Sequence, residues 1–433
     1  MLKTKISVFL LIVSIISVNA QQKLSADEAV SIALKNNYDI LVAKNSYDAS
    51  RINNTPGNAG MLPGVTISAG GNIALSNVDQ KYSDGTEGKY PGSHSNSLSS
   101  GIGLNWTLFD GGKMFVTKNK LNEIQSLGEI QFKGQVLQTE NDVITAYYNV
   151  VRQSQQLVSI EEAINSVKVM VNILQTSFGA GLSPKTTLLQ AEIDLNVYRE
   201  NAINQQAVII AAKRTLNQLL SRDPNTAFDV ADSIPVGNLP GRDELIKKLY
   251  ESNTSVMEFS KLVEIAKLSL RENKSQLLPR LLFNAGYNLS HSNNSIGSVS
   301  MNQSLGPQVG GTLSIPVFQS GNATRQIRTA NLQLQSAEYN LESIKLSVNS
   351  ELQNTLTSYE NQLQMLGIEK TNLDLAKENL SITMERLRLG QTTSPELHQA
   401  QQSYVDSHTR FIDFEYNLKV AETKLKQLLA ILQ

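Results

Sequence analysis

The chain has 433 residues, a nearly balanced charge of 38 basic against 39 acidic residues, and no cysteine. The absence of cysteine excludes disulfides, thiolate metal sites, a cysteine nucleophile and a lipid anchor on an N-terminal cysteine. The balanced charge provides no basic surface for nucleic acid, and the length allows two or more domains.

Residues 1–20 have the pattern of a secretory signal peptide. Lys3 and Lys5 form a basic start, an apolar run of 13 residues covers Ile6–Val18, and Ala20 ends a small-residue cleavage site. No other apolar run approaches the ~20 residues of a membrane helix. We therefore expect a secreted chain without a transmembrane helix, which is periplasmic, extracellular or a β-barrel in an outer membrane.

The rest of the chain contains two copies of one unit. Matching pairs at an offset of 209 residues include Phe109 with Phe318, Gly112 with Gly321, and Gly181 with Gly390. A fixed offset of this kind indicates internal duplication. We predict repeat 1 over residues 21–220, a linker over 221–240, and repeat 2 over 241–433.

Each copy is expected to begin with a helix. In repeat 1, Ser25 and Glu28 have the spacing of a capping box. The helix is predicted to run toward Leu62–Pro63, with a break near Asn53–Gly57 where turn-forming residues cluster.

The sequence pattern then changes to alternating apolar and polar residues, which predicts a β-hairpin in each copy. The hairpins are expected over residues 65–109 and 280–318, with a polar loop over 77–96 in the first. Each strand should have about 10 residues, the length of a tilted transmembrane strand. Pro316 lacks an amide donor and is placed at the end of its strand.

After each hairpin, the apolar residues recur every three or four positions, as in a coiled coil. In repeat 1, a helix from Gly112 to about Phe178 would be roughly 100 Å long. A turn and a return helix of about 36 residues follow in each copy. The pairs Ser183–Pro184 and Ser394–Pro395 predict a serine N-cap with proline in the first helical position.

Four strands per chain are too few to close a membrane barrel. An open edge in lipid leaves backbone groups unpaired, at a cost of several kcal/mol each, and single-chain bacterial barrels start at about eight strands. The chain must therefore pool strands with copies of itself, and the sequence alone allows two, three or more copies.

The doubled order of helix, Leu-Pro, hairpin, Phe-x-x-Gly, long helix and return helix resembles the TolC-like outer-membrane efflux protein family. The motifs LNWTLFDGG at Leu104–Gly112 and LSIPVFQSG at Leu313–Gly321 mark the last strand of each hairpin. The resemblance implies an α+β membrane protein that forms a homotrimer. Four strands per chain would build one β-barrel in the outer membrane of a Gram-negative bacterium, continued by a periplasmic α-helical coiled-coil barrel.

The same resemblance implies a passive exit duct of a tripartite efflux or type I secretion system. A periplasmic adaptor, or membrane fusion protein, would connect it to a proton-driven or ATP-driven inner-membrane pump. A structural coiled-coil surface or adhesion protein without transport is the alternative, although hairpins of membrane length argue against it. The sequence offers no catalytic constellation, metal-ligand spacing or cofactor motif, so we expect no enzyme.

The resemblance assigns contacts with the adaptor to the two turns at the helix tips. These residues are Gly179, Ala180, Gly181, Leu182, Leu389, Gly390, Gln391 and Thr392. The simpler interpretation is that the glycines only end a helix, and both roles are compatible.

The resemblance also assigns three positions to the channel entrance, namely Glu396, Gln399 and Thr187. In a trimer, Glu396 would form a ring of three carboxylates that favours cations. The alternative is that Glu396 only stabilises the start of its helix, where an acidic residue complements the dipole. Sequence reasoning leaves both open.

Aromatic residues mark the membrane–water interface in the predicted barrel. Trp106, Phe109 and Phe318 lie at the ends of the last strands, where aromatic side chains contact lipid headgroups. Outer-membrane lipid is therefore an expected partner.

Overall fold

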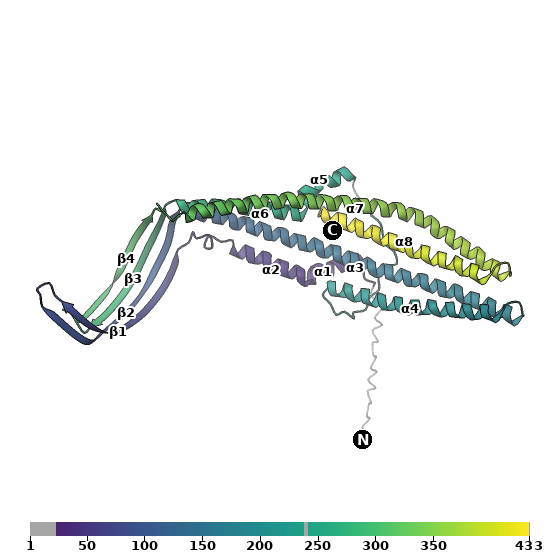
Figure 1. Ribbon diagram of the computed structural model, residues 1–433, viewed down its shortest axis with the longest axis horizontal. Helices are drawn as coiled ribbons and strands as arrows, with labels where there is room; N and C mark the ends of the chain where they lie inside the picture. The colour runs from purple at the N-terminus through teal and green to yellow at the C-terminus, as the bar shows by residue number, and fades with distance from the viewer. Residues whose placement is uncertain (1–22, 238–240, 433) are drawn as a thin grey trace, which may run out of the picture. The chain divides into compact units, whose positions relative to one another are not determined.

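The computed structural model describes residues 23–237 and 241–432 (Figure 1). The predicted signal peptide at 1–20 lies outside the described residues. Among the helices that are described, none is long and apolar enough to cross a membrane. The chain divides into two units, each considered separately. The helical unit comprises Met1–Ile40, Val136–Arg242 and Leu352–Gln433, and the sheet unit comprises Leu41–Gln135 and Asp243–Glu351.

The sheet unit contains one antiparallel sheet with the strand order β1-β2-β3-β4 (Figure 1). The strands are β1 (Gly64–Lys81), β2 (Glu87–Asp110), β3 (Arg280–Asn294) and β4 (Met301–Ser314). They have 14 to 24 residues, so the expected length of about 10 was wrong. The predicted loop over 77–96 is mostly strand, because ladder hydrogen bonds need only backbone groups and polar side chains do not interrupt them.

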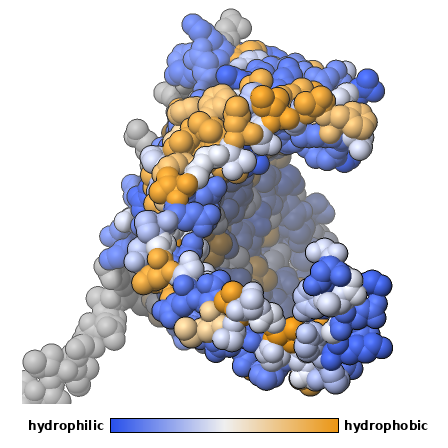
Figure 2. All heavy atoms as spheres, turned by 90° about the vertical axis from the view of Figure 1, so that its left-hand side faces the viewer, coloured by the Kyte–Doolittle hydropathy of each residue, from blue (hydrophilic) through white to orange (hydrophobic). Residues whose placement is uncertain are grey.

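The register places apolar side chains on one face of the sheet, which confirms the predicted alternation. One cross-strand row consists of Val65, Leu104, Ala285 and Val309, and the next of Ile67, Ile102, Tyr287 and Pro307. The row between them on the opposite face consists of Thr66, Gly103, Gly286 and Gln308. Figure 2 faces the sheet end of Figure 1 and shows apolar groups gathered in a band beside hydrophilic surface. Ile67 on the apolar face is 81% exposed, so the described residues of one chain leave it uncovered.

A β-bulge near the end of β2 changes which residues continue the apolar face. The register shifts between Thr107 and Phe109, so Leu108 is the extra residue and Phe109 pairs with Leu281. β4 ends at Ser314, two residues before Pro316. Ile315, Val317 and Phe318 therefore lie outside the strand, contrary to the predicted hairpin end at 318.

Asparagine caps divide the first helical segment of each copy in two. The pairs are α1 (Ala26–Asn36) with α2 (Tyr38–Asn53), and α5 (Arg242–Ser252) with α6 (Thr254–Lys274), which continues into η1 (Ser275–Leu277). Asn37 Oδ1 accepts hydrogen bonds from the amides of Asp39 and Ile40. Asn253 caps α6 in the same way, and neither break was predicted. The predicted capping box of Ser25 and Glu28 is present.

Four long helices follow the hairpins as expected. They are α3 (Lys113–Gly179), α4 (Lys185–Leu219), α7 (Asn322–Arg388) and α8 (Ser394–Leu428). α3 and α7 have 67 residues each, and α4 and α8 have 35 each. In the helical unit, α4 runs back along α3 and α8 along α7 (Figure 1), and all four share one core around Val167, Met170, Ala191, Leu387 and Leu397.

The starts of the two return helices differ from the prediction. The N-cap residues are Pro184 in α4 and Thr393 in α8, not the serines. In α8 the capping box of Thr393 and Glu396 fixes the first residue, so Ser394 falls inside the helix.

Candidate functional site

The two helix tips of the helical unit share one turn geometry. Gly181 and Gly390 have φ of +75° and +69°, in the left-handed region that favours glycine. The amide of Leu182 donates to the Ser177 carbonyl at 2.8 Å, and the amide of Gln391 donates to the Arg386 carbonyl at 2.8 Å. This is the Schellman pattern, in which a left-handed residue lets the chain turn back over the last helical carbonyls.

The predicted tip residues lie on the surface of these two turns. Leu182 is 83% exposed and Leu389 is 62% exposed, so each tip presents a large apolar side chain to solvent. Gly179, Ala180, Gly181, Gly390 and Gln391 are exposed, and Thr392 is half-buried. A Cβ atom added at either Gly181 or Gly390 would meet nothing within 4 Å. The glycines are therefore required by backbone conformation, not by packing within the chain.

Glu396 bonds at the start of its own helix. Its carboxylate accepts a short hydrogen bond from the Thr392 hydroxyl and another from the Thr393 amide at 3.4 Å. Both bonds lower the pKa of the Glu396 carboxyl, and the bond from Thr392 has the larger effect. Glu396 is therefore ionised at neutral pH. In the described residues, no hydrogen bond or ion pair joins it to Gln399, which is exposed, or to Thr187, which is half-buried on α4.

Polar contacts that the sequence did not predict link α8 to α3 and α4. His398 Nδ1 lies 3.4 Å from Asp194 Oδ2, and the Tyr404 hydroxyl donates to Glu162 at 2.8 Å. Burial, together with the Glu162 carboxylate, raises the pKa of Tyr404 to about 12. Gln401 Nε2 donates to the Ala163 carbonyl at 3.1 Å. These pairs join residues that lie far apart in the sequence, so a single sequence does not predict them.

The predicted interface aromatics differ in their surroundings. Trp106 is 38% exposed, and its Nε1 donates to the Met61 carbonyl at 2.9 Å. Phe109 pairs with Leu281 in the last apolar row of the sheet, before the row of Asp110 and Arg280. Phe318 is 84% exposed and lies outside the sheet.

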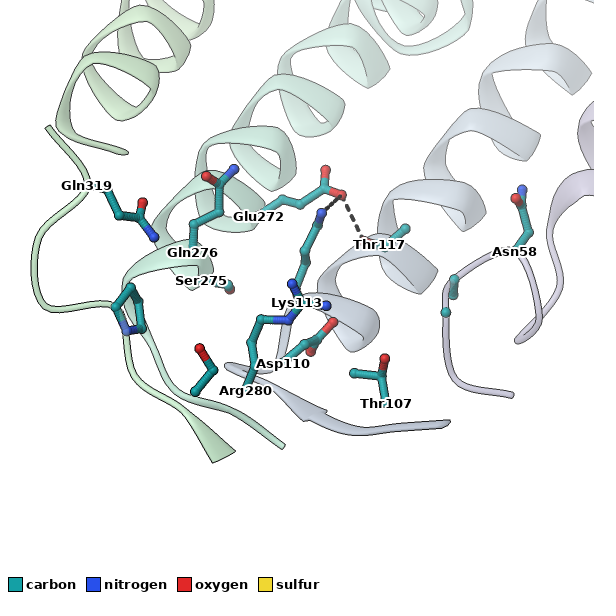
Figure 3. A pocket seen from close by; sticks show the side chains of 14 residues that line it. Asn58, Thr107, Asp110, Lys113, Thr117, Glu272, Ser275, Gln276, Arg280 and Gln319 are labelled. Carbon is teal, nitrogen blue, oxygen red and sulfur yellow. Dashed lines mark hydrogen bonds and ion pairs between the residues drawn. The ribbon is translucent and has the colours of Figure 1, made fainter. Parts of the chain in front are cut away.

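A charged cavity of about 660 Å³ lies in the sheet unit, where the strands meet α3 and α6 (Figure 3). The Glu272 carboxylate accepts hydrogen bonds from Lys120 and from Thr117, the latter at 2.9 Å. Burial raises the pKa of Glu272, but these hydrogen bonds outweigh it and the net shift is downward. The sequence does not predict this cluster, because Glu272 lies 155 residues from Thr117 and 152 residues from Lys120.

Comparison with known proteins identifies the fold and the family. The chain is similar to the Campylobacter jejuni CmeC outer membrane channel, at 17% identity and a TM-score of 0.77 over 93% of this chain and 85% of that one. It is similar to VceC of Vibrio cholerae, at 14% identity and a TM-score of 0.75 over 93% of this chain and 95% of that one. It is also similar to the open state of MtrE of Neisseria gonorrhoeae, at 15% identity and a TM-score of 0.73 over 93% of this chain and 88% of that one. At these identities the likeness concerns the fold, and no curated protein matched significantly.

The family model described as outer membrane efflux protein matches residues 29–222 and 245–430, which is most of the chain and includes both copies of the duplicated pattern. The fold is that of these outer-membrane channels, with an antiparallel sheet in one unit and long paired helices in the other. The chain therefore belongs to the outer membrane efflux protein family, whose members are outer-membrane channels of tripartite efflux systems.

Proposed function

We propose that the chain forms a homotrimer that serves as the passive exit duct of an efflux system. The observation that supports this most directly is an open four-stranded sheet with one apolar face and one polar face. An apolar face of this kind suits lipid, and the polar face suits a water-filled lumen.

The edges of the sheet support closure by further copies. β1 and β4 each have one paired neighbour in the sheet, so their outer edges have no ladder partner within the described chain. Such edges cost several kcal/mol per unpaired group in lipid. Three chains with four strands each would close one barrel and remove every edge.

Apolar stripes on the helical unit point to the same assembly. Ile368, Leu375 and Ile382 recur at heptad spacing on α7 and are 53% to 63% exposed. On α4, Leu189 and Ile193 form a second exposed stripe. Stripes of this spacing pack in coiled coils, so we assign them to contacts between neighbouring copies.

The helix tips are the proposed contact for a periplasmic adaptor. Both turns expose the backbone around Gly181 and Gly390, next to one large apolar side chain each. The adaptor would join the duct to an inner-membrane pump that supplies the energy. We propose that Glu396 lines the entrance while it caps its helix, with Gln399 and Thr187 as its polar neighbours in the assembled ring. The alternative of a non-transporting adhesion protein is not retained, because the chain belongs to an efflux family.

Two experiments test this proposal. Electrophoresis of the outer-membrane fraction with and without heating should show a trimer that dissociates on heating, whereas a monomer would contradict the proposal. A photoreactive residue at Gln391 in intact cells should capture an adaptor. A proton-driven pump recovered with it would indicate small-molecule efflux, and an ATP-driven transporter would indicate type I secretion. Capture of no adaptor would overturn the tripartite assignment.

A further inference from the structure

The polar face of the sheet ends in the charged cavity of Figure 3, which duct formation alone does not explain. Asp110 pairs with Arg280, and Arg280 with Ser314, in the last row of the sheet. This row follows the apolar row of Phe109, Leu281 and Leu313, so its side chains lie on the polar face. All three line the cavity, so this part of its lining belongs to the face assigned to water.

Both carboxylates at the cavity are already engaged. The two oxygens of Asp110 each lie 3.1 Å from the Met114 amide, where they cap the start of α3. Glu272 is held by Lys120 and Thr117. Both acids therefore already accept hydrogen bonds, and neither is paired with Arg280 in the described chain.

Two cations are left with unfilled hydrogen-bonding capacity. Arg280 is exposed, and within the described chain its guanidinium has no hydrogen bond or ion pair. Lys113 Nζ reaches Glu272 Oε1 at 3.9 Å, which is an ion pair at the limit of contact. Figure 3 shows Arg280, Lys113 and Asp110 together below Glu272. Among the residues that line the cavity, two cations, Arg280 and Lys113, stand beside two carboxylates, Asp110 and Glu272. Within the described chain, Arg280 is the member of this set without a hydrogen bond or ion pair.

We propose that this cavity binds the carboxylate or phosphate group of an anionic ligand, with Arg280 as its main donor and Lys113 as the second cation. A guanidinium presents a planar fork that matches either group with two parallel hydrogen bonds, and an ammonium adds a point charge. The assignment to solutes in transit rests on the proposed duct. A phospholipid headgroup has the same chemistry and is the other possible source.

The test is equilibrium binding of labelled inorganic phosphate and of labelled succinate to the purified full-length protein in detergent. We expect saturable binding of one anion per chain, weakened about tenfold by Arg280→Gln, because a charge-assisted bidentate pair is lost. The matched control is Arg328→Gln, an exposed arginine of α7 that does not line the cavity. Equal binding by the wild type and Arg280→Gln would overturn the site.

Two further measurements identify the source of the anion and separate this site from the duct. Native mass spectrometry that finds a phospholipid on the wild type but not on Arg280→Gln would support the site and assign it to a headgroup. In planar bilayers, Arg280→Gln should shift the reversal potential in a salt gradient toward cations, and Arg328→Gln should not. A wild type that binds phosphate yet forms no conducting channel would refute the duct and leave the site intact. A conducting channel without anion binding would refute the site alone.

Discussion

The Tyr147 hydroxyl donates a hydrogen bond to the Leu24 carbonyl oxygen at 2.8 Å and accepts one from the Ala231 amide at 3.0 Å. One buried side chain of α3 thereby holds the start of the described chain and the segment between the two repeats. The same segment places Phe228, Val230 and Ile234 in the core of the helical unit. The predicted linker over 221–240 is therefore a packed element where it is described.

Replacing Tyr147 by phenylalanine should loosen this segment. Tyr147 is 1% exposed, so the carbonyl and the amide would lose their partner in a site that water does not reach freely. An unsatisfied buried group costs ~1–3 kcal/mol. We expect a lower unfolding temperature by circular dichroism and faster tryptic cleavage near Arg222. Tyr38→Phe is the control, because Tyr38 is 70% exposed and its hydroxyl has no partner in the described structure. Equal losses in both variants would contradict this role.

The two faces of the sheet should respond differently to charge. Ile67 lies on the apolar face and Thr66 on the polar face, one residue apart on β1. Lysine on a lipid-facing position costs ~2–4 kcal/mol near the bilayer midplane. Ile67→Lys should reduce the heat-modifiable protein in the outer-membrane fraction, and Thr66→Lys should leave it near the wild-type level. The reverse ranking would assign the apolar face to the lumen.

Much of this fold could be predicted from the sequence because apolar spacing reports burial directly. Alternation predicted the strands up to Trp106, and three-to-four spacing predicted the two longest helices, α3 and α7. The strand ends were lost because Gln80 and Gly88 pair through backbone groups that hydropathy does not register. The breaks at Asn37 and Asn253 depend on local caps, and the pattern of apolar residues does not mark them.

The candidate site was less accessible to sequence reasoning. The duplicated glycines marked both tips, because a left-handed turn favours glycine wherever it occurs. The pairs Lys120 with Glu272, and Glu162 with Tyr404, join residues 152 and 242 positions apart. A single sequence carries no signal for such pairs, since a charged residue looks the same whether it is paired or solvated.

The glycine at the second tip separates a backbone role from a contact role. Gly390→Ala forces a Cβ into a left-handed residue and should cost ~1–2 kcal/mol, whereas Gly390→Asn tolerates this conformation better and adds a larger side chain. A Cβ atom at this position meets no atom within 4 Å. If the adaptor needs the bare backbone, capture from Gln391 should fall in both variants. Normal capture by Gly390→Asn with loss in Gly390→Ala would limit the glycine to ending the helix.

Glu396 can be tested without removing its cap. Glutamine also accepts the capping bonds, so Glu396→Gln removes the charge and retains an acceptor for Thr392 and Thr393. Because its pKa is lowered, Glu396 is charged throughout the neutral range and should keep its effect down to acidic pH. We expect Glu396→Gln to reduce block of the open channel by multivalent cations in planar bilayers. Glu360→Gln is the control and should leave the block unchanged. If Glu396→Gln also left the block unchanged, Glu396 would have only its role in capping α8.

A buried carboxylate holds α7 to α8 farther from the tip. Glu369 is 5% exposed and accepts hydrogen bonds from the Ser407 hydroxyl and from Arg410 Nη2, the latter at 2.9 Å. Burial raises its pKa, but the bonds from Ser407, Arg410 and Asn372 outweigh burial, so the pKa is lowered. The positions of repeat 1 that lie 209 residues before Glu369, Ser407 and Arg410 are Ile160, Tyr198 and Asn201. This set of contacts around Glu369, here called the Glu369 lock, therefore occurs in repeat 2 only.

This lock should make the α7–α8 pair sensitive to acid. A carboxyl whose pKa is lowered in the folded state stabilises it fully above the ordinary value near 4.5, and this stabilisation is lost as the pH falls through the lowered pKa. Glu369→Gln should cost about 2 kcal/mol at pH 7 and flatten the loss of stability below pH 4.5, because the charged hydrogen bonds are absent at every pH. Glu360→Gln, on an exposed face of the same helix, should keep the wild-type acid profile. Thermal unfolding of the purified protein at pH 7 and pH 4 measures both effects. Parallel profiles for Glu369→Gln and the wild type would exclude Glu369 as the source of the acid sensitivity.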